Sequence, residues 1–276
     1  MVRASKDVSA ALAQLRPALR DTRESLEVMR RVVREHGDAD LVVFPELFLS
    51  GYTTSKPEEL ALDLDGPQIG TVTRLARESS TAVIFGAPER VSAGVANSAI
   101  CVDRDGTLAG SYRKTHLFGS EREAYVAGDE LLIVNLDGTR VGLMICFDVE
   151  FPEVARALAK AGADLFVTIS ANMDPFGRDH DVFATARALE NGVPHLYVNQ
   201  VGRGEAFTFA GGTTIVSADG DRLAGAGAAK QAMVRHRLDL SARSAQRPKD
   251  LRPDYLKEMR GTLPVVERAR RGTRTA

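Results

Sequence analysis

Short apolar runs alternate with segments of helical periodicity along most of the chain. Runs with the length and composition of strands lie at residues 7–15, 41–44, 82–85, 165–169 and 195–201. Apolar residues recur at a helical spacing in residues 26–33, 69–76, 154–158 and 182–189. Strands that alternate with helices in this way predict an α/β protein with layered sheets and helices.

Three Asp-Gly pairs lie between β-rich flanks, at residues 105–106, 137–138 and 219–220. Asp-Gly suits the two-residue turns of β-hairpins, because glycine adopts positive φ without steric cost. Hairpins join antiparallel strands, whereas strands joined through helices pair in parallel. The sequence therefore predicts mixed sheets.

Three chemically interesting side chains each follow a predicted strand. Glu46 comes after the run 41–44, Lys114 after the return strand of the first hairpin, and Cys146 after that of the second. Ligands of α/β sheets bind beyond the carboxyl ends of strands. We therefore expect these three side chains to meet at one edge of the fold.

Length, composition and charge limit the class of protein. The chain has 276 residues, of which 44% are hydrophobic and 26% charged, and its formal net charge is -1. These values suit one globular domain over residues 1–276 without extended disorder. The net charge argues against a nucleic-acid binder. Without a secretory signal or an apolar run of about 20 residues, we expect a cytoplasmic protein that does not enter a membrane.

The C-terminal segment, residues 241–276, is basic but also carries apolar residues such as Tyr255, Leu256 and Val265. A basic run alone indicates a solvated surface. The apolar residues instead favour an arm that packs on its own domain or on a second subunit. We predict an arm at a subunit interface and a homodimer or larger homo-oligomer.

Two cysteines do not form a disulfide framework, so each is interpreted separately. Cys146 stands between an apolar strand and a helix that begins near Pro152, and amide groups and the helix dipole there would favour a thiolate. The ordinary alternative is a small buried hydrophobic residue. We assign that structural role to Cys101, which lacks such surroundings.

Glu46 and Lys114 also have ordinary alternatives, a solvated strand-end carboxylate and a surface lysine. The neighbours of Glu46 are apolar, so we expect partial desolvation, a raised pKa and a capacity for proton transfer. A lysine beside a glutamate would be functional where it stabilises a developing negative charge.

Taken together, the motifs resemble those of the nitrilase superfamily, the carbon-nitrogen hydrolases, over nearly the whole chain. The similar segments are residues 44–46, 51–52, 112–116, 127–129, 145–148, 151–153, 187–191 and 211–213. The resemblance implies a four-layer αββα sandwich and a catalytic triad of Glu46, Lys114 and Cys146. It also implies a second glutamate after the lysine, for which Glu121 is preferred and Glu123 stays open.

The resemblance implies hydrolysis of a small amide through a cysteine thioester. Glu46 would move protons, and Lys114 with the backbone N–H of Phe147 would hold the oxyanion. Candidate substrate-binding residues are Tyr52, Glu123, Asn172 and Met173.

Nitrilases proper commonly place Trp-Glu after the cysteine, whereas this chain has Phe147-Asp148 and no tryptophan. An amidase that releases ammonia from a carboxamide is therefore preferred. The alternatives are an N-carbamoyl amide hydrolase, of the ureidopropionase or carbamoylputrescine amidase type, and a nitrilase. A non-catalytic binding or scaffold protein on the same fold is a further alternative.

The sequence predicts no metal and no cofactor. Its five histidines are widely separated and form no ligand pair, and no dinucleotide-binding fingerprint is present. His116 is interpreted as a hydrogen-bonded neighbour of the site. The absence of a G-x-S-x-G elbow argues against a serine hydrolase.

Overall fold

The computed structural model describes residues 7–240, which form two six-stranded sheets and one two-stranded sheet. The first sheet has the order β14 (Ala232–Asp239), β1 (Asp7–Gln14), β2 (Leu41–Val43), β3 (Ala82–Val91), β4 (Gly94–Val102) and β5 (Leu108–Arg113). The second has the order β13 (Arg222–Gly225), β12 (Thr214–Val216), β9 (His195–Asn199), β8 (Leu165–Ser170), β7 (Thr139–Ile145) and β6 (Ile133–Leu136). The small sheet pairs β10 (Val201–Arg203) with β11 (Thr208–Ala210).

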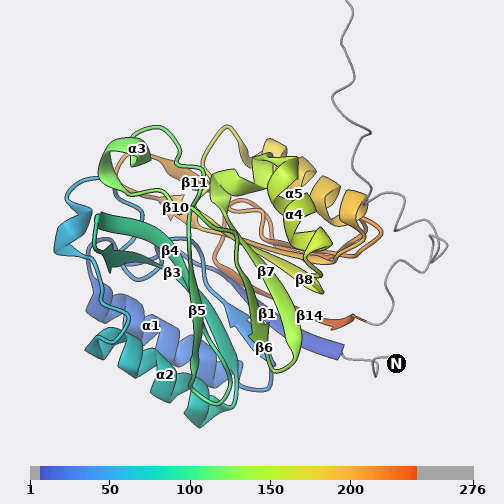
Figure 1. The fold of residues 1–276 in the computed structure, drawn as a ribbon, viewed down its shortest axis with the longest axis horizontal. Coiled ribbons are helices and arrows are strands. Elements are labelled where there is room, and N and C mark those ends of the chain that lie inside the picture. The colour runs from blue at the N-terminus through green and yellow to red at the C-terminus, as the bar shows by residue number, and fades with distance from the viewer. Residues whose placement is uncertain (1–6, 241–276) are drawn as a thin grey trace, which may run out of the picture.

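Helices cover the outer faces of the two large sheets. The α-helices are α1 (Thr22–Glu35), α2 (Pro67–Ser79), α3 (Glu121–Ala124), α4 (Pro152–Lys160) and α5 (Gly177–Asn191). Short 3-10 helices are η1 (Pro57–Glu59) and η2 (Cys146–Glu150). In Figure 1, α1 and α2 lie on the first sheet, and α4 and α5 lie on the second. The predicted four-layer αββα sandwich is confirmed.

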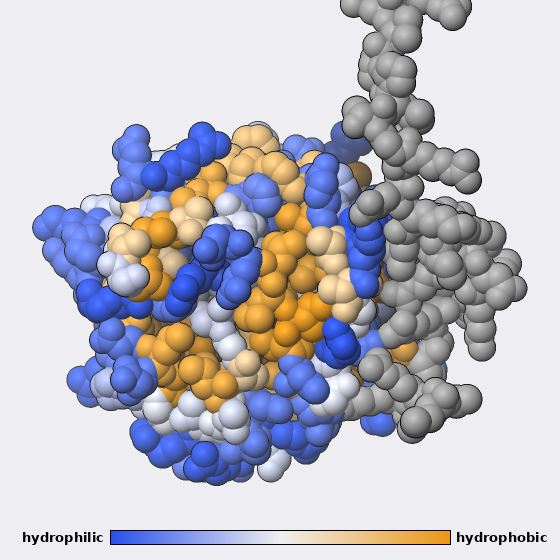
Figure 2. Space-filling model, in the orientation of Figure 1, coloured by the Kyte–Doolittle hydropathy of each residue, from blue (hydrophilic) through white to orange (hydrophobic). Residues whose placement is uncertain are grey.

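The largest apolar core lies between the two sheets. Inward-facing residues of both sheets, such as Leu12, Val43, Leu143 and Val167, are fully buried there. Each helix layer adds its own core, as the apolar periodicity of the helices predicts. The edge strands β5 and β6 lie beside each other, and apolar side chains gather on the face where β6 and β7 run (Figures 1 and 2).

Both large sheets are mixed, as the turn motifs predict. In the first sheet β1, β2 and β3 are parallel, and in the second β7, β8 and β9 are parallel; the remaining pairs are antiparallel. All three Asp-Gly pairs lie in turns between antiparallel strands. Asp137 and Gly138 both have positive φ, 46° and 80°, as a type I′ turn requires.

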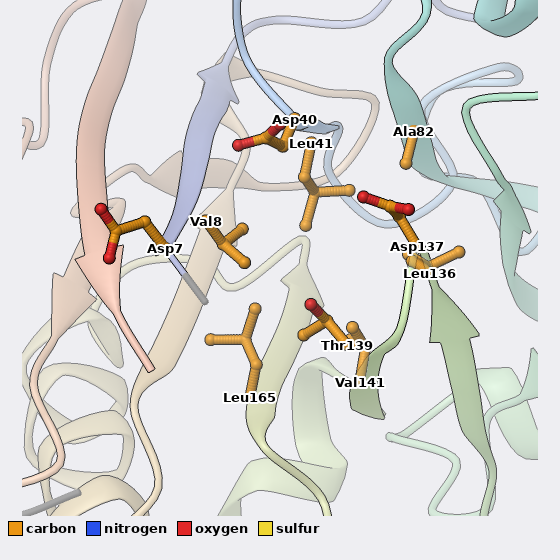
Figure 3. Close-up of a pocket in the computed structure, with 10 residues that line it drawn as sticks. All are labelled: Asp7, Val8, Asp40, Leu41, Ala82, Leu136, Asp137, Thr139, Val141 and Leu165. Atoms are coloured by element: carbon orange, nitrogen blue, oxygen red, sulfur yellow. The ribbon is translucent and has the colours of Figure 1, made fainter. Parts of the chain in front are cut away.

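The carboxyl ends of the parallel strands place predicted catalytic residues at one end of the sandwich. Glu46 follows β2, Cys146 follows β7, and Ala171 follows β8 at this end. A pocket at the opposite end lies among strand starts and contains no predicted catalytic residue (Figure 3). The residues that line it are Asp7, Val8, Asp40, Leu41, Ala82, Leu136, Asp137, Thr139, Val141 and Leu165.

Two further expectations concern the C-terminal segment and the absence of a membrane-spanning helix. The predicted C-terminal arm, residues 241–276, lies outside the described residues. Among the helices within residues 7–240, none is both long and apolar enough to cross a bilayer.

Candidate active site

Glu46 lies in the loop after β2, and its carboxylate is fully buried. Its Oε1 accepts hydrogen bonds from Asn97 Nδ2 at 2.7 Å and Lys114 Nζ at 2.8 Å, and its Oε2 accepts one from the backbone N–H of Ala171 at 2.7 Å. Burial raises the pKa of Glu46 above its ordinary value, although the Lys114 ammonium opposes the shift. The expectation that the Glu46 carboxylate is desolvated is confirmed.

Close backbone packing fixes the loop that carries Glu46. Leu47, the next residue, has a left-handed backbone with φ 48°. A Cβ on Gly86 of β3 would lie 2.1 Å from the backbone nitrogen of Leu47, so only glycine permits this approach. Gln200 Nε2 donates to the carbonyl oxygen of Glu46 at 2.6 Å. The loop is therefore held from both sheets.

Lys114 directly follows β5 and is fully buried. Its Nζ lies 2.8 Å from Glu46 Oε1 and 2.8 Å from Glu121 Oε2. Burial disfavours the charge, but the two carboxylates outweigh burial and hold the pKa of Lys114 well above its ordinary value. The lysine is thus a buried ammonium between two carboxylates, as its predicted role requires.

Glu121, at the start of α3, is the second carboxylate of this cluster. Its side chain is fully buried, and it accepts hydrogen bonds from Tyr52 OH at 2.9 Å and from the backbone N–H of Phe118 at 2.8 Å. Glu123, two residues later, is exposed. The structure therefore brings Glu121 to Lys114 and leaves Glu123, also expected to bind substrate, outside the cluster.

Cys146 stands immediately after β7 and is 8% exposed, with a left-handed backbone at φ 46°. Its sulfur interacts electrostatically with Glu46 and Lys114 and hydrogen-bonds Ser170. Burial, followed by the charge of Glu46, raises the pKa of the Cys146 thiol well above its ordinary value. The expectation that the N-terminus of the following helix favours a thiolate was wrong, because Cys146 begins η2, α4 starts only at Pro152, and burial outweighs the other influences on the thiol.

Asp148, fully buried in η2, joins the segment that carries Cys146 to the segment that carries Lys114. Its Oδ2 accepts hydrogen bonds from Ile145 N–H at 2.9 Å and Tyr112 OH at 2.8 Å. Its Oδ1 lies 3.0 Å from Thr115 Oγ1, 3.0 Å from His116 N and 2.9 Å from His116 Nδ1. These bonds fix the segment around Cys146 and so offset the strain of its positive φ.

His116 therefore is a hydrogen-bonded neighbour of the site, as predicted. Its ring also stacks on Phe151, with centroids 3.8 Å apart. Within residues 7–240, no group of three or more His, Cys, Asp or Glu side chains is arranged to hold a metal ion.

The other predicted substrate-binding residues line or support the surroundings of the cluster. Tyr52 and Met173 are buried in one apolar cluster with Phe209. Asn172 instead uses its side chain locally, because its Nδ2 donates to Phe176 O at 3.0 Å and its Oδ1 accepts from Met173 N at 2.9 Å. Asn172 thus shapes the loop after β8 more directly than it presents a group to a ligand.

Sequence reasoning missed the polar residues that orient the cluster. Asn97 contacts Glu46 from the middle of β4, Ser170 contacts Cys146 from the end of β8, and Gln200 follows β9. Each is a polar residue in or beside a continuously buried strand. A buried polar residue needs a partner, so this pattern was a usable signal.

Comparisons with known proteins identify the family. The sequence model of the carbon-nitrogen hydrolase family matches residues 9–248. An (R)-stereoselective amidase from Pseudomonas sp. is 41% identical over 81% of this chain and 81% of its own. A probable nitrilase from Schizosaccharomyces pombe is 33% identical over 92% of this chain and 95% of its own.

Solved structures of an amidase from Nesterenkonia sp. share the fold, with a TM-score of 0.77 at 26% identity over 92% of this chain and 98% of that one. A glutamate-to-glutamine variant of that amidase, from strain AN1, carries the acetamide moiety of fluoroacetamide covalently on its active-site cysteine. The family match, the amidase and nitrilase relatives and the shared fold lead to one conclusion: this chain is a member of the carbon-nitrogen hydrolase family, within the nitrilase superfamily and close to its amidases.

Proposed function

We propose that this enzyme hydrolyses a small carboxamide to a carboxylic acid and ammonia through a thioester on Cys146. The observation that carries the proposal is the fully buried cluster of Glu46, Lys114 and Glu121, which interacts electrostatically with a cysteine that retains 8% exposure. One ammonium faces two carboxylates, so the cluster holds one negative charge in excess. Such a charge in a desolvated site suits a base that removes a thiol proton.

In the first half-reaction, Glu46 accepts the thiol proton and the Cys146 sulfur attacks the amide carbonyl carbon. The negative charge moves from the carboxylate to the carbonyl oxygen, where Lys114 and the backbone N–H of Phe147 stabilise it. Glu46 returns the proton to the departing nitrogen, the C–N bond breaks and ammonia leaves. The net charge of the buried cluster never changes, because the proton and the negative charge are exchanged within it.

In the second half-reaction, Glu46 removes a proton from water and the resulting hydroxide attacks the thioester. The C–S bond breaks, the acid leaves, and the proton returns to the sulfur. Glu121 keeps Lys114 charged and oriented throughout, since it contributes the second carboxylate around the ammonium. The cycle consumes one amide and one water and releases one acid and one ammonia.

Two observations favour a carboxamide over a nitrile. Phe147-Asp148 stands after the cysteine, and Asp148 is fully engaged in holding the neighbouring segments. The (R)-stereoselective amidase and the Nesterenkonia amidase are amide hydrolases by name, and a cysteine-to-alanine variant of the latter was solved in complex with butyramide. We extend this chemistry to small aliphatic carboxamides for the present chain.

Ammonia release from a panel of carboxamides, nitriles and N-carbamoyl compounds tests the proposal. We expect the wild type to release ammonia from carboxamides without carbon dioxide. Cys146→Ala should lose at least about a thousandfold of this activity and keep its fold. The matched control is Cys101→Ala, which removes the other buried free thiol and should leave turnover intact. Carbon dioxide evolved with ammonia, or undiminished turnover by Cys146→Ala, would contradict the proposal.

A further inference from the structure

A chain of hydrogen bonds runs from behind the nucleophile towards the surface, and the reaction scheme above does not use it. Ser170 lies beside Cys146, because the residues before them, Ile169 and Ile145, pair in the parallel register of β8 and β7, and its hydroxyl interacts with the sulfur. Ser170 Oγ accepts a hydrogen bond from Tyr197 OH at 3.1 Å. Tyr197 OH lies 2.8 Å from His180 Nδ1, and His180 Nε2 lies 3.3 Å from Glu150 Oε1. The first three side chains are buried, and Glu150 is 32% exposed. We call these four residues the Ser170 chain.

The partners fix the direction of these hydrogen bonds. Ser170 Oγ also accepts from the backbone N–H of Asn172 at 3.1 Å, so both of its acceptor positions are occupied. Its single proton is therefore directed at the Cys146 sulfur. Tyr197 gives its proton to Ser170, so its oxygen accepts from His180, whose Nδ1 must carry a hydrogen. The hydroxyls of Ser170 and Tyr197 and the Nδ1–H of His180 therefore all donate towards the nucleophile.

We propose that the Ser170 chain is a positioning device that holds a hydrogen-bond donor against the Cys146 sulfur and stabilises the thiolate as Glu46 removes its proton. This inference deepens the proposed function, on which it rests for the role of the cysteine. Tyr197 and His180 touch no reacting atom and act only by orienting the hydroxyl of Ser170.

The electrostatics of the site explain why the sulfur needs this donor. Burial and the Glu46 carboxylate both disfavour a negative sulfur, and Lys114 is shared between two carboxylates. A directed hydroxyl offsets part of that penalty, since hydrogen bonds to charged groups are stronger than neutral ones. At the far end, the Glu150 carboxylate faces the other ring nitrogen of His180, Nε2, at 3.3 Å.

The pH behaviour of the sulfur depends on a defined set of groups. Those that interact electrostatically with the sulfur are Glu46, Lys114, Glu121 and Tyr52, besides Tyr197 of the Ser170 chain itself. At the other end of the Ser170 chain, Glu150 of η2 and Tyr197 of β9 face His180. Arg187, which lies in α5 with His180, donates to the backbone carbonyl oxygen of Glu150 at 3.0 Å. Variants of the Ser170 chain leave the first set unchanged.

The test is the rate at which methyl methanethiosulfonate modifies Cys146 as a function of pH. The reagent is small and contains no amide. The thiolate attacks its sulfenyl sulfur, a methyl disulfide forms and methanesulfinate leaves, and mass spectrometry of the Cys146 peptide gives the rate. We expect Ser170→Ala to lower the rate near neutral pH about tenfold. We expect Tyr197→Phe, which does not touch the sulfur, to lower it at least about threefold and to move the midpoint of the pH profile upward.

A second pair of variants separates positioning from simple damage to the core. His180→Phe removes the donor to Tyr197 and should shift the profile in the same direction. The control, His195→Phe, removes an equally buried histidine whose partners are Thr168 and Ala184, and should leave the profile in place. The inference is overturned where Tyr197→Phe and His180→Phe keep the wild-type profile, or where His195→Phe shifts it equally. Because the probe is not an amide, a wild type that fails to hydrolyse amides would contradict the proposed function alone.

Discussion

The replacement of Asp148 by asparagine removes the charge of the residue that joins the Lys114 segment to the Cys146 segment, while its size is kept. Both carboxylate oxygens accept backbone hydrogen bonds, one from Ile145 N–H and the other from His116 N–H. Neither backbone donor can turn away. Whichever way the asparagine amide is oriented, its NH₂ group therefore meets a backbone N–H.

The magnitude follows from the bonds that are lost. One orientation of the amide loses two hydrogen bonds at the former Oδ2 position, and the other loses up to three at Oδ1. At about 1.5 kcal/mol for each bond to a charged group, Asp148→Asn should cost about 3 kcal/mol or more of unfolding free energy. Since a mid-sized domain loses about 2–4 °C for each kcal/mol, Tm should fall by about 6–12 °C.

Activity should fall as well, because the hydrogen bonds through Asp148 no longer fix the Lys114 segment relative to the Cys146 segment. A misplacement of about 1 Å commonly costs about a hundredfold in rate, which we expect for kcat/KM on a carboxamide. Calorimetry and steady-state kinetics measure the two effects. The control is Asp181→Asn, an exposed carboxylate 3.6 Å from Arg222, which should change Tm by less than about 2 °C. A Tm and kcat/KM for Asp148→Asn equal to those of the control would refute the reasoning.

The remaining predictions concern the base, its loop and its partner carboxylate. Because the pKa of Glu46 is raised, its basic form is lost as pH falls at a value above 4.5, and the acid limb of kcat/KM should lie there; an acid limb at or below 4.5 in the pH profile would contradict this. Gly86→Ala should lower kcat/KM at least about tenfold, because the added Cβ would clash with the loop that carries Glu46. The control is Gly70→Ala in α2, where the nearest atom to the added Cβ is 3.8 Å away, and this variant should raise Tm slightly. Equal effects of the two variants in kinetics and calorimetry would count against the loop argument. Tyr52→Phe removes the hydroxyl that donates to Glu121 and should lower kcat about tenfold with little change in Tm. An unchanged kcat would show that this hydrogen bond does not help to orient Glu121.

Local patterns predicted the order of elements well but missed the length of β3. The strand was expected over residues 82–85, because Gly86 and Pro88 interrupt the apolar run. In the structure it continues to Val91, since it pairs with β4 along its full length and Gly86 admits the Glu46 loop. That pairing is a tertiary effect, which local propensity does not contain.

The candidate site was predictable where a strand end carries a motif. Glu46, Lys114 and Glu121 meet in the structure, but the choice between Glu121 and Glu123 depended on which face of α3 is buried. The raised pKa of Cys146 was not predictable, because burial in the assembled sandwich outweighs the local helix. The cytoplasmic location and the homo-oligomer stay predictions, and sedimentation of the full chain would measure the latter.

The central claim is that the buried carboxylate and ammonium activate the Cys146 sulfur to carry the acyl group. Rapid acid quench of the enzyme with a small carboxamide such as butyramide, followed by peptide mass spectrometry, tests it most directly. The account predicts an acyl thioester on Cys146 that forms with one equivalent of ammonia and disappears as the acid is released. Turnover of the amide with no acyl mass on Cys146, or with the acyl group on another residue, would contradict it.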